Sequence, residues 1–349
     1  HALTVLNKTS SNATAARTIF LVHSFLFSWT RPTRDALKPL LQAYSMGFQS
    51  GDTEAACFSI NKWLNFKFIL GTSLESLEAD IELYLRQMND LKKAQVLKNM
   101  SSFHQLVLNL MHRDNVDDPT RFYGRGLTED EYYSSRSKPM WNASVGRFHG
   151  VLLTFFGHHI RRADFLVEHG HDYYTKVHIA SNCIMQDTYL NGVSCFAAAR
   201  ETGKSHYAKI GEIYRSKIKK WIRQGNPNVK HYEALLDAEV MAWQGKHSAA
   251  VKCFQTAILL SGRGGYQHDV ALASERYGEF LLSIMKDQDE GLYRLKEAAK
   301  YWQGWGAHAK VESLEQRHGV VSGLQKSSDI IGLHISVSTR HLSSRTAES

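Results

Sequence analysis

The sequence predicts an all-α protein, and three observations carry that prediction. Apolar residues recur at helical spacing through most of the 349 residues. Only five prolines occur, and 43% of the residues are hydrophobic against 22% charged, which is typical of a folded, helix-rich chain. Several helical segments come in pairs separated by a turn that contains glycine. We therefore expect a fold built from antiparallel helix hairpins.

The clearest pair runs from His231 to Gly262 and breaks at Gln244-Gly245-Lys246. Apolar residues repeat at helical spacing on both sides of the break: Leu235, Ala238, Met241 and Ala242 before it, and Ala250, Phe254, Ala257 and Ile258 after it. Small residues allow helices to cross closely, glycine allows the tight turn, and a large ring fills the remaining gap. This combination predicts a hairpin of the tetratricopeptide type.

The same spacing recurs along the chain. A turn glycine is followed five residues later by alanine at Gly51/Ala56, Gly203/Ala208 and Gly245/Ala250, and one residue later still at Gly157/Ala163. The last three turns are 42 to 46 residues apart, somewhat longer than the regular repeat of about 34 residues. We expect these hairpins to stack into an α-solenoid.

The chain divides into five parts by composition and periodicity. These are a frayed N-terminus (1–12), N-terminal hairpins (13–111), an irregular connection (112–139) with a short helix at 128–135, tetratricopeptide-like repeats (140–319) and a disordered Ser-rich tail or linker (320–349). In the second part we expect helices at 13–28, 33–49, 53–71, 73–90 and 92–111. The segment Ser73-Leu-Glu-Ser-Leu-Glu predicts a helix start, at which a hydroxyl of Ser73 or Ser76 and a nearby carboxylate satisfy the free amides as in a capping box. The apolar run Thr18–Trp29 is too short to span a bilayer and suits a buried helix.

Net charge and cysteine content indicate which partners and which cellular compartment to expect. The net charge of +8 and pI of about 9.2 permit weak binding to acidic surfaces, but no nucleic-acid reader motif accompanies them, so nucleic acid is not an expected partner. The four cysteines, Cys57, Cys183, Cys195 and Cys253, are far apart and form no Cys-x-x-Cys pair. Buried free thiols in a reducing compartment are expected, which favours the cytoplasm.

No catalytic motif is present. The sequence lacks a phosphate-binding loop, a dinucleotide-binding glycine pattern, His-Glu-x-x-His and Gly-x-Ser-x-Gly. We therefore expect no cofactor and no catalytic residue. One alternative stays open, because six histidines (His149, His158, His159, His169, His171 and His178) fall within thirty residues, and two or three on one helix face could bind zinc. Surface and loop histidines are the other reading of this cluster.

Two candidate docking surfaces appear. Residues 201–230 form a basic amphipathic helix that includes Lys217, Lys220 and Arg223, although a solvated outer face of a repeat explains the same pattern. Trp302 and Trp305 close the last hairpin; if exposed, they would suggest docking to a neighbouring domain.

Three stretches carry a resemblance to a known family. RPTRDALKPLLQAYSMGFQSG (31–51), VALASERYGE (270–279) and YWQGWGAHAKVESL (301–314) resemble motifs in the helical-repeat region of large hybrid signalling proteins. In that family the region follows an AAA or STAND-type ATPase, often behind a serine/threonine kinase domain, and precedes a sensor and a histidine kinase. The resemblance implies architecture over about residues 13–318, and no catalytic residue transfers.

These observations lead to a first hypothesis and two alternatives. The first is a non-catalytic helical-repeat scaffold that couples or regulates the ATPase and kinase modules of a multidomain signalling protein. Its partners would be neighbouring domains or protein segments. A free-standing adaptor that binds protein segments is the second, and a metal-dependent enzyme that uses the 149–178 histidines is the third. We also expect the apolar face of helix 13–28 to be covered by an upstream domain.

Overall fold

The computed structural model describes residues 12–114, 117–135, 139–172 and 183–319, and these residues form only helices, turns and connecting segments. This confirms the all-α class. The α-helices are α2 (Asn12–Leu21), α3 (Leu37–Ser50), α4 (Thr53–Ile69), α5 (Leu74–Asp90), α6 (Ala94–Met111), α7 (Glu129–Ser135), α8 (Pro139–Phe155), α9 (His159–His169), α11 (Cys183–Thr202), α12 (Ser205–Arg223), α13 (Lys230–Trp243), α14 (His247–Gly264), α15 (Gln267–Phe280), α16 (Gln288–Trp305) and α17 (His308–His318). Short irregular helices are η1 (Val22–Leu26), η2 (Phe27–Trp29), η3 (Thr33–Ala36) and η4 (Leu281–Met285).

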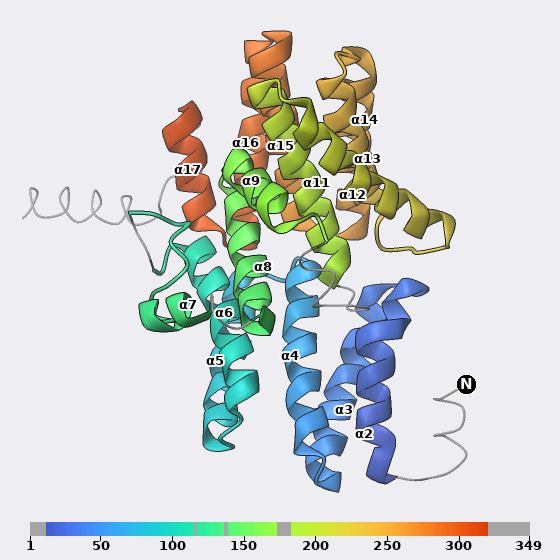
Figure 1. Ribbon diagram of the computed structural model, residues 1–349, viewed down its shortest axis with the longest axis vertical. Coiled ribbons are helices and arrows are strands. Elements are labelled where there is room, and N and C mark those ends of the chain that lie inside the picture. Colours follow the sequence, from blue (N-terminus) through green and yellow to red (C-terminus); the bar gives the residue numbers. More distant parts are fainter. Residues whose placement is uncertain (1–11, 115–116, 136–138, 173–182, 320–349) are drawn as a thin grey trace, which may run out of the picture.

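Consecutive helices pair into hairpins. In the described part of the chain the pairs are α3/α4, α5/α6, α11/α12, α13/α14 and α15/α16, each joined by a short connection and packed together. Figure 1 shows α2–α6 in the lower half of the view and α11–α17 in the upper half. Helix α8 packs on α6 and α11, and α9 packs on α8 and α11. The hairpins therefore form two sets, and α8 packs against both.

Glycine closes three of these turns, at the positions that the repeat predicts. Gly51, Gly203 and Gly245 have φ values of +81°, +73° and +70°. This left-handed conformation is costly for residues with a Cβ atom. At the turns of α5/α6 and α15/α16 a lysine takes the positive φ instead, Lys92 at 54° and Lys286 at 58°, which explains why the glycine pattern does not mark those two hairpins.

Small residues lie where the paired helices cross. Four of the predicted repeat positions are fully buried: Ala56, Ala250, Phe254 and Ala257. Ala208 is half-buried. A Cβ atom on Gly47 of α3 would lie 2.9 Å from the Cβ of Ala56 on α4. A Cβ atom on Gly278 of α15 would lie 2.8 Å from Leu295 on α16. Close helix approach therefore depends on these residues having little or no side chain.

The apolar run at 18–29 is not one helix, so the expected helix at 13–28 is wrong in its second half. Helix α2 ends at Leu21 and is followed by a π-helical turn and a 3-10 turn. Asn228, from the segment before α13, donates to the carbonyl oxygens of Ser28 and Arg31 at 2.7 and 2.9 Å. These bonds to a segment almost 200 residues away set the path of the chain where helical periodicity alone predicts a continuous helix.

The connection after α6 is packed against that helix. Asn109 donates to the carbonyl oxygens of Pro119 and Arg121, and Gln105 accepts from the backbone amides of Gly126 and Leu127. The helix expected at 128–135 is present as α7. Ser73 caps α5 by accepting from the Ser76 amide at 3.3 Å, which confirms the expected helix start. The third residue after Ser73 is Ser76 and not a glutamate, so no capping box forms. Capping at Ser76 is not seen, because that residue lies inside α5.

Two further expectations concern the environment. All four cysteines are free, and Cys57, Cys183 and Cys195 are buried. Within the described residues, no helix is both long and apolar enough to cross a bilayer. The expected frayed N-terminus falls almost entirely on residues 1–11, and the expected tail on residues 320–349, both outside the described residues.

Replacing Ala250 by leucine tests the hairpin geometry. Ala250→Leu should lower the free energy of unfolding by about 1–3 kcal/mol, because the added side-chain atoms have no room where α14 packs on α13. Denaturant titration measures the change. The control is Ala79→Leu, on an exposed face of α5, which should stay within about 0.5 kcal/mol of the wild type. Equal stability of the two variants would contradict a close crossing at Ala250.

Candidate functional site

Charged side chains form a connected set in the interior of the C-terminal hairpins. We call this set the ion-pair network; its members are Arg200, Glu239, Glu275, Arg276, Glu279, Lys310 and Arg317. They come from α11, α13, α15 and α17. Charged residues are rarely buried unless they are paired, so this concentration identifies the most distinctive chemical feature of the fold.

Glu239 is the centre of the network. Its side chain has no exposed surface, and it accepts from Arg200 at 2.9 Å and from Arg276 at 2.7 Å. Arg276 also pairs with Glu279 on the same helix. Burial by itself would raise the pKa of Glu239, but the two guanidinium groups hold it below its ordinary value. The carboxylate therefore joins α11, α13 and α15.

Glu275, which precedes Arg276 on α15, is the second residue at which several bonds of the network meet. It accepts from Lys310 at 2.6 Å, from Arg317 at 2.9 Å and from the indole nitrogen of Trp302 at 3.0 Å. Lys310 is fully buried, and this burial lowers its pKa to about 8 although Glu275 opposes the shift. The bonds join α15, α16 and α17.

His159 connects the network to α8 and α9. Arg276 donates to Nε2 of His159 at 3.0 Å, which assigns that nitrogen as the acceptor of a neutral imidazole. Nδ1 then faces Ser194 at 3.4 Å, and Ser194 lies 2.9 Å from Thr154. Burial, followed by the nearby Arg276 and Arg200, holds the pKa of His159 well below its ordinary value.

Two adjoining hollows open over the network. Their volumes are about 580 and 420 Å³, and both are lined by Gly157, His159 and Glu201. We call them the α9–α15 groove. Its lining also includes two half-exposed apolar residues, Ile160 on α9 and Ile284 on η4, which are 39% and 37% exposed. Exposed apolar side chains beside fixed charges are a feature of binding surfaces.

The groove suits binding better than proton transfer. A general acid or base needs a pKa near the working pH, whereas His159 and Glu279 have pKa values held below their ordinary ranges. Lys310, with its pKa of about 8, lines neither hollow. Partial desolvation by the neighbouring side chains raises the pKa of Glu201 above its ordinary value. The lining thus presents mostly permanent charges.

Trp302 and Trp305 are not a docking surface. Both indoles are fully buried, and their nitrogens donate to Glu275 and to the carbonyl oxygen of Thr72. The prediction is wrong because amphipathic spacing does not show that the end of α16 packs against Phe68 and Thr72 of the N-terminal hairpins. On α12, Lys220 and Arg223 are exposed while Lys217 is half-buried over the ring of Tyr214. These three side chains do not line the groove.

The histidines at 149–171 do not gather into a metal site. His149 stacks on Phe122, His169 stacks on Phe165, and His159 belongs to the network. In the described residues, the one group of three side chains with metal-binding geometry lies elsewhere, on α5 and α6. His178 lies outside the described residues, so its position adds nothing to this comparison.

The sequence motifs did not identify the residues of the ion-pair network as a site. Glu275, Arg276 and Glu279 lie within VALASERYGE, and Glu239 follows the small residue Ala238 in the first helix of the clearest hairpin. Charged residues placed between buried apolar positions are the signal that could have identified them. Their partners, however, lie 35 to 42 residues away in the chain.

Comparisons with family models, with curated proteins and with solved structures returned no match. The candidate site therefore depends on its geometry alone. The resemblance of residues 31–51, 270–279 and 301–314 to a signalling family stays a prediction.

Substituting Glu275 should destabilise the fold more than substituting its partner Lys310. Glu275→Gln should cost about 3–5 kcal/mol of unfolding free energy, because it leaves the buried Lys310 without a carboxylate. Lys310→Met should be close to neutral, since Glu275 keeps Arg317 and Trp302 as donors. Chemical denaturation of both variants measures the difference, and equal losses would contradict the assignment of Glu275 as the shared partner.

Acid should weaken the fold through His159. The folded pKa lies well below the ordinary 6.5, so the unfolded chain binds the proton more tightly. This contribution is complete above about pH 6.5 and is lost as the pH falls below it. His159→Gln keeps a donor and an acceptor but does not titrate, so its melting temperature should fall less between about pH 7.5 and 5. His206→Gln, at an exposed site on α12, should behave as wild type; an unaltered pH profile in His159→Gln would rule out this role.

Proposed function

We propose that this chain is a non-catalytic helical-repeat scaffold that holds a neighbouring domain or protein segment in the α9–α15 groove. The observation that carries the proposal is the groove itself, with half-exposed isoleucines beside a buried set of paired charges. Preorganised charges bind a complementary polypeptide without first being ordered, and the apolar side chains supply area to bury.

The helix arrangement supports a scaffold. Stacked hairpins in repeat proteins bury a continuous core and present side chains of successive helices on one surface. Here α11, α13, α15 and α17 contribute to a single network beside the groove. The chain also carries a π-helical segment, η4, at the groove wall, and such segments are frequent at functional sites.

The proposed setting is a multidomain signalling protein in the cytoplasm, in which the scaffold couples ATPase and kinase modules. Its support is the resemblance of three sequence stretches and the absence of phosphate-binding motifs from the sequence. The alternative is a free-standing adaptor that uses the same groove for segments of other proteins. The two differ in where the bound polypeptide is encoded.

Photocrosslinking in the whole gene product tests the proposal. A photoreactive amino acid replaces Ile160 or Ile284 in the groove, and Leu259, which is 51% exposed on α14, in the control. Both groove positions should crosslink well above the control, because a bound segment would lie against them. Mass spectrometry of the crosslinked peptides identifies the occupant.

The origin of the crosslinked peptide separates the two settings. Peptides from another domain of the same polypeptide would support coupling of modules, and peptides from a different protein would support the adaptor. Crosslinking at Ile160 and Ile284 no stronger than at Leu259 would contradict a docking groove.

A further inference from the structure

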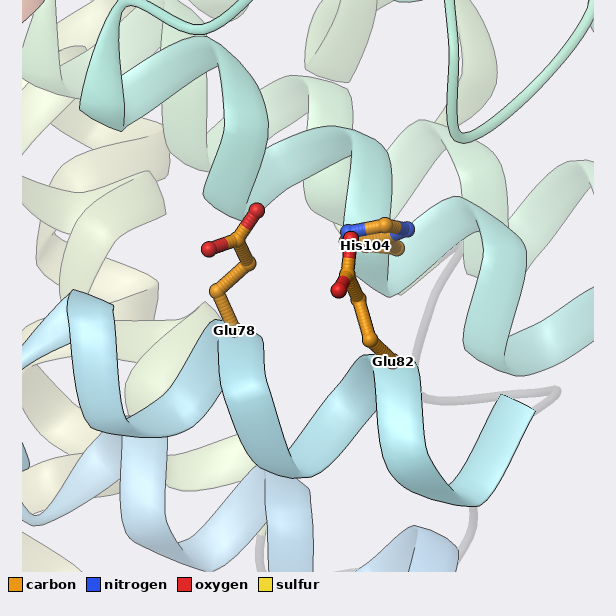
Figure 2. A group of neighbouring side chains, drawn as sticks. All are labelled: Glu78, Glu82 and His104. Carbon is orange, nitrogen blue, oxygen red and sulfur yellow. The ribbon is translucent and has the colours of Figure 1, made fainter. Parts of the chain in front are cut away.

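A carboxylate-rich cluster outside the groove joins the two helices of the α5/α6 hairpin. Glu78 and Glu82 lie one turn apart on α5, and His104 faces them from α6, as Figure 2 shows. One ligand atom from each residue lies within 4.8 Å of the other two. Figure 2 also shows a ring nitrogen of His104 directed toward the carboxylate of Glu82.

His104 supplies an independent sign of a ligand. Its residue is 6% exposed, and its Nε2 is buried without a hydrogen-bond partner in the protein. A buried polar atom left without a partner destabilises the fold, so a ligand at this nitrogen would remove that penalty. A neutral imidazole nitrogen carries a lone pair that can coordinate a cation.

We propose that Glu78, Glu82 and His104 form a binding site for a first-row divalent cation, with Zn²⁺ the preferred ion. An imidazole nitrogen with two carboxylates is a ligand set that zinc accepts, whereas Ca²⁺ and Mg²⁺ favour oxygen ligands alone. Three protein ligands leave a fourth tetrahedral position for water. Small side-chain movements would bring atoms now up to 4.8 Å apart to coordination distance.

Two arginines compete with the cation. Arg113 and Arg125 both pair with Glu78, and Arg125 also lies 4.0 Å from Glu82. The arginine side chains are 48% and 55% exposed, so each can turn into solvent when a cation replaces it. Both residues belong to the connection between α6 and α7. Cation binding is therefore linked to the release of this connection from Glu78, and zinc and the guanidinium groups exclude one another.

Equilibrium dialysis of the metal-free protein against zinc chloride, with melting temperatures at each zinc concentration, tests the site. Glu82→Gln and His104→Gln should each lose roughly tenfold or more in zinc affinity. The control His206→Gln removes an exposed histidine on α12 and should bind as wild type. Arg125→Ala should bind zinc more tightly than wild type, because it removes a competing cation.

The arginine variant distinguishes a metal site from a purely structural ion-pair cluster. A structural cluster would lose stability in Arg125→Ala with no gain in zinc affinity, and that result would overturn the proposal. Equal zinc affinity in wild type, Glu82→Gln and His206→Gln would overturn it as well. If His104→Gln does not fold, Glu82→Gln decides the question, since Glu82 is half-exposed.

Discussion

The burial of Glu239 is the constraint on which the packing of the C-terminal hairpins depends. Apolar contacts are non-directional and tolerate small shifts between helices. A carboxylate with no exposed surface does not, because an unpaired buried charge costs several kcal/mol. Arg200 and Arg276 approach it from different helices. The relative positions of α11, α13 and α15 are therefore set by charged hydrogen bonds as well as by shape.

This constraint extends to the groove. Arg276 contacts Glu239 in the core and His159 at the groove wall, and Arg317 joins Glu279 at the groove to Glu275 beneath it. A polypeptide in the groove would meet side chains that also position the helices. Any difference in its affinity between two packings of the hairpins would shift their balance by that same free energy. A scaffold that couples domains requires such a connection between its binding surface and its packing.

Local features of the sequence predicted the helices and their turns well. Gly51, Gly203 and Gly245 mark real left-handed turns, and Ala250 with Phe254 marks a buried crossing. These features succeed because a turn and a helix crossing depend on residues within one hairpin. The same periodicity could not show which side of α16 is covered, so Trp302 and Trp305 were candidates for a docking surface although both are buried.

The sites depend instead on how distant hairpins meet. The Glu78 and Glu82 spacing on one helix face is visible in the sequence, but His104 meets them only because α5 and α6 turn back at Lys92. Glu239 and Arg276 are 37 residues apart and meet because α13 and α15 belong to successive hairpins. Successive side chains of an α-helix point about 100° apart, so a shift of one residue in how these helices pair would separate the groups. The register between helices, which the sequence of a single helix does not specify, thus determines both the ion-pair network and the cation cluster.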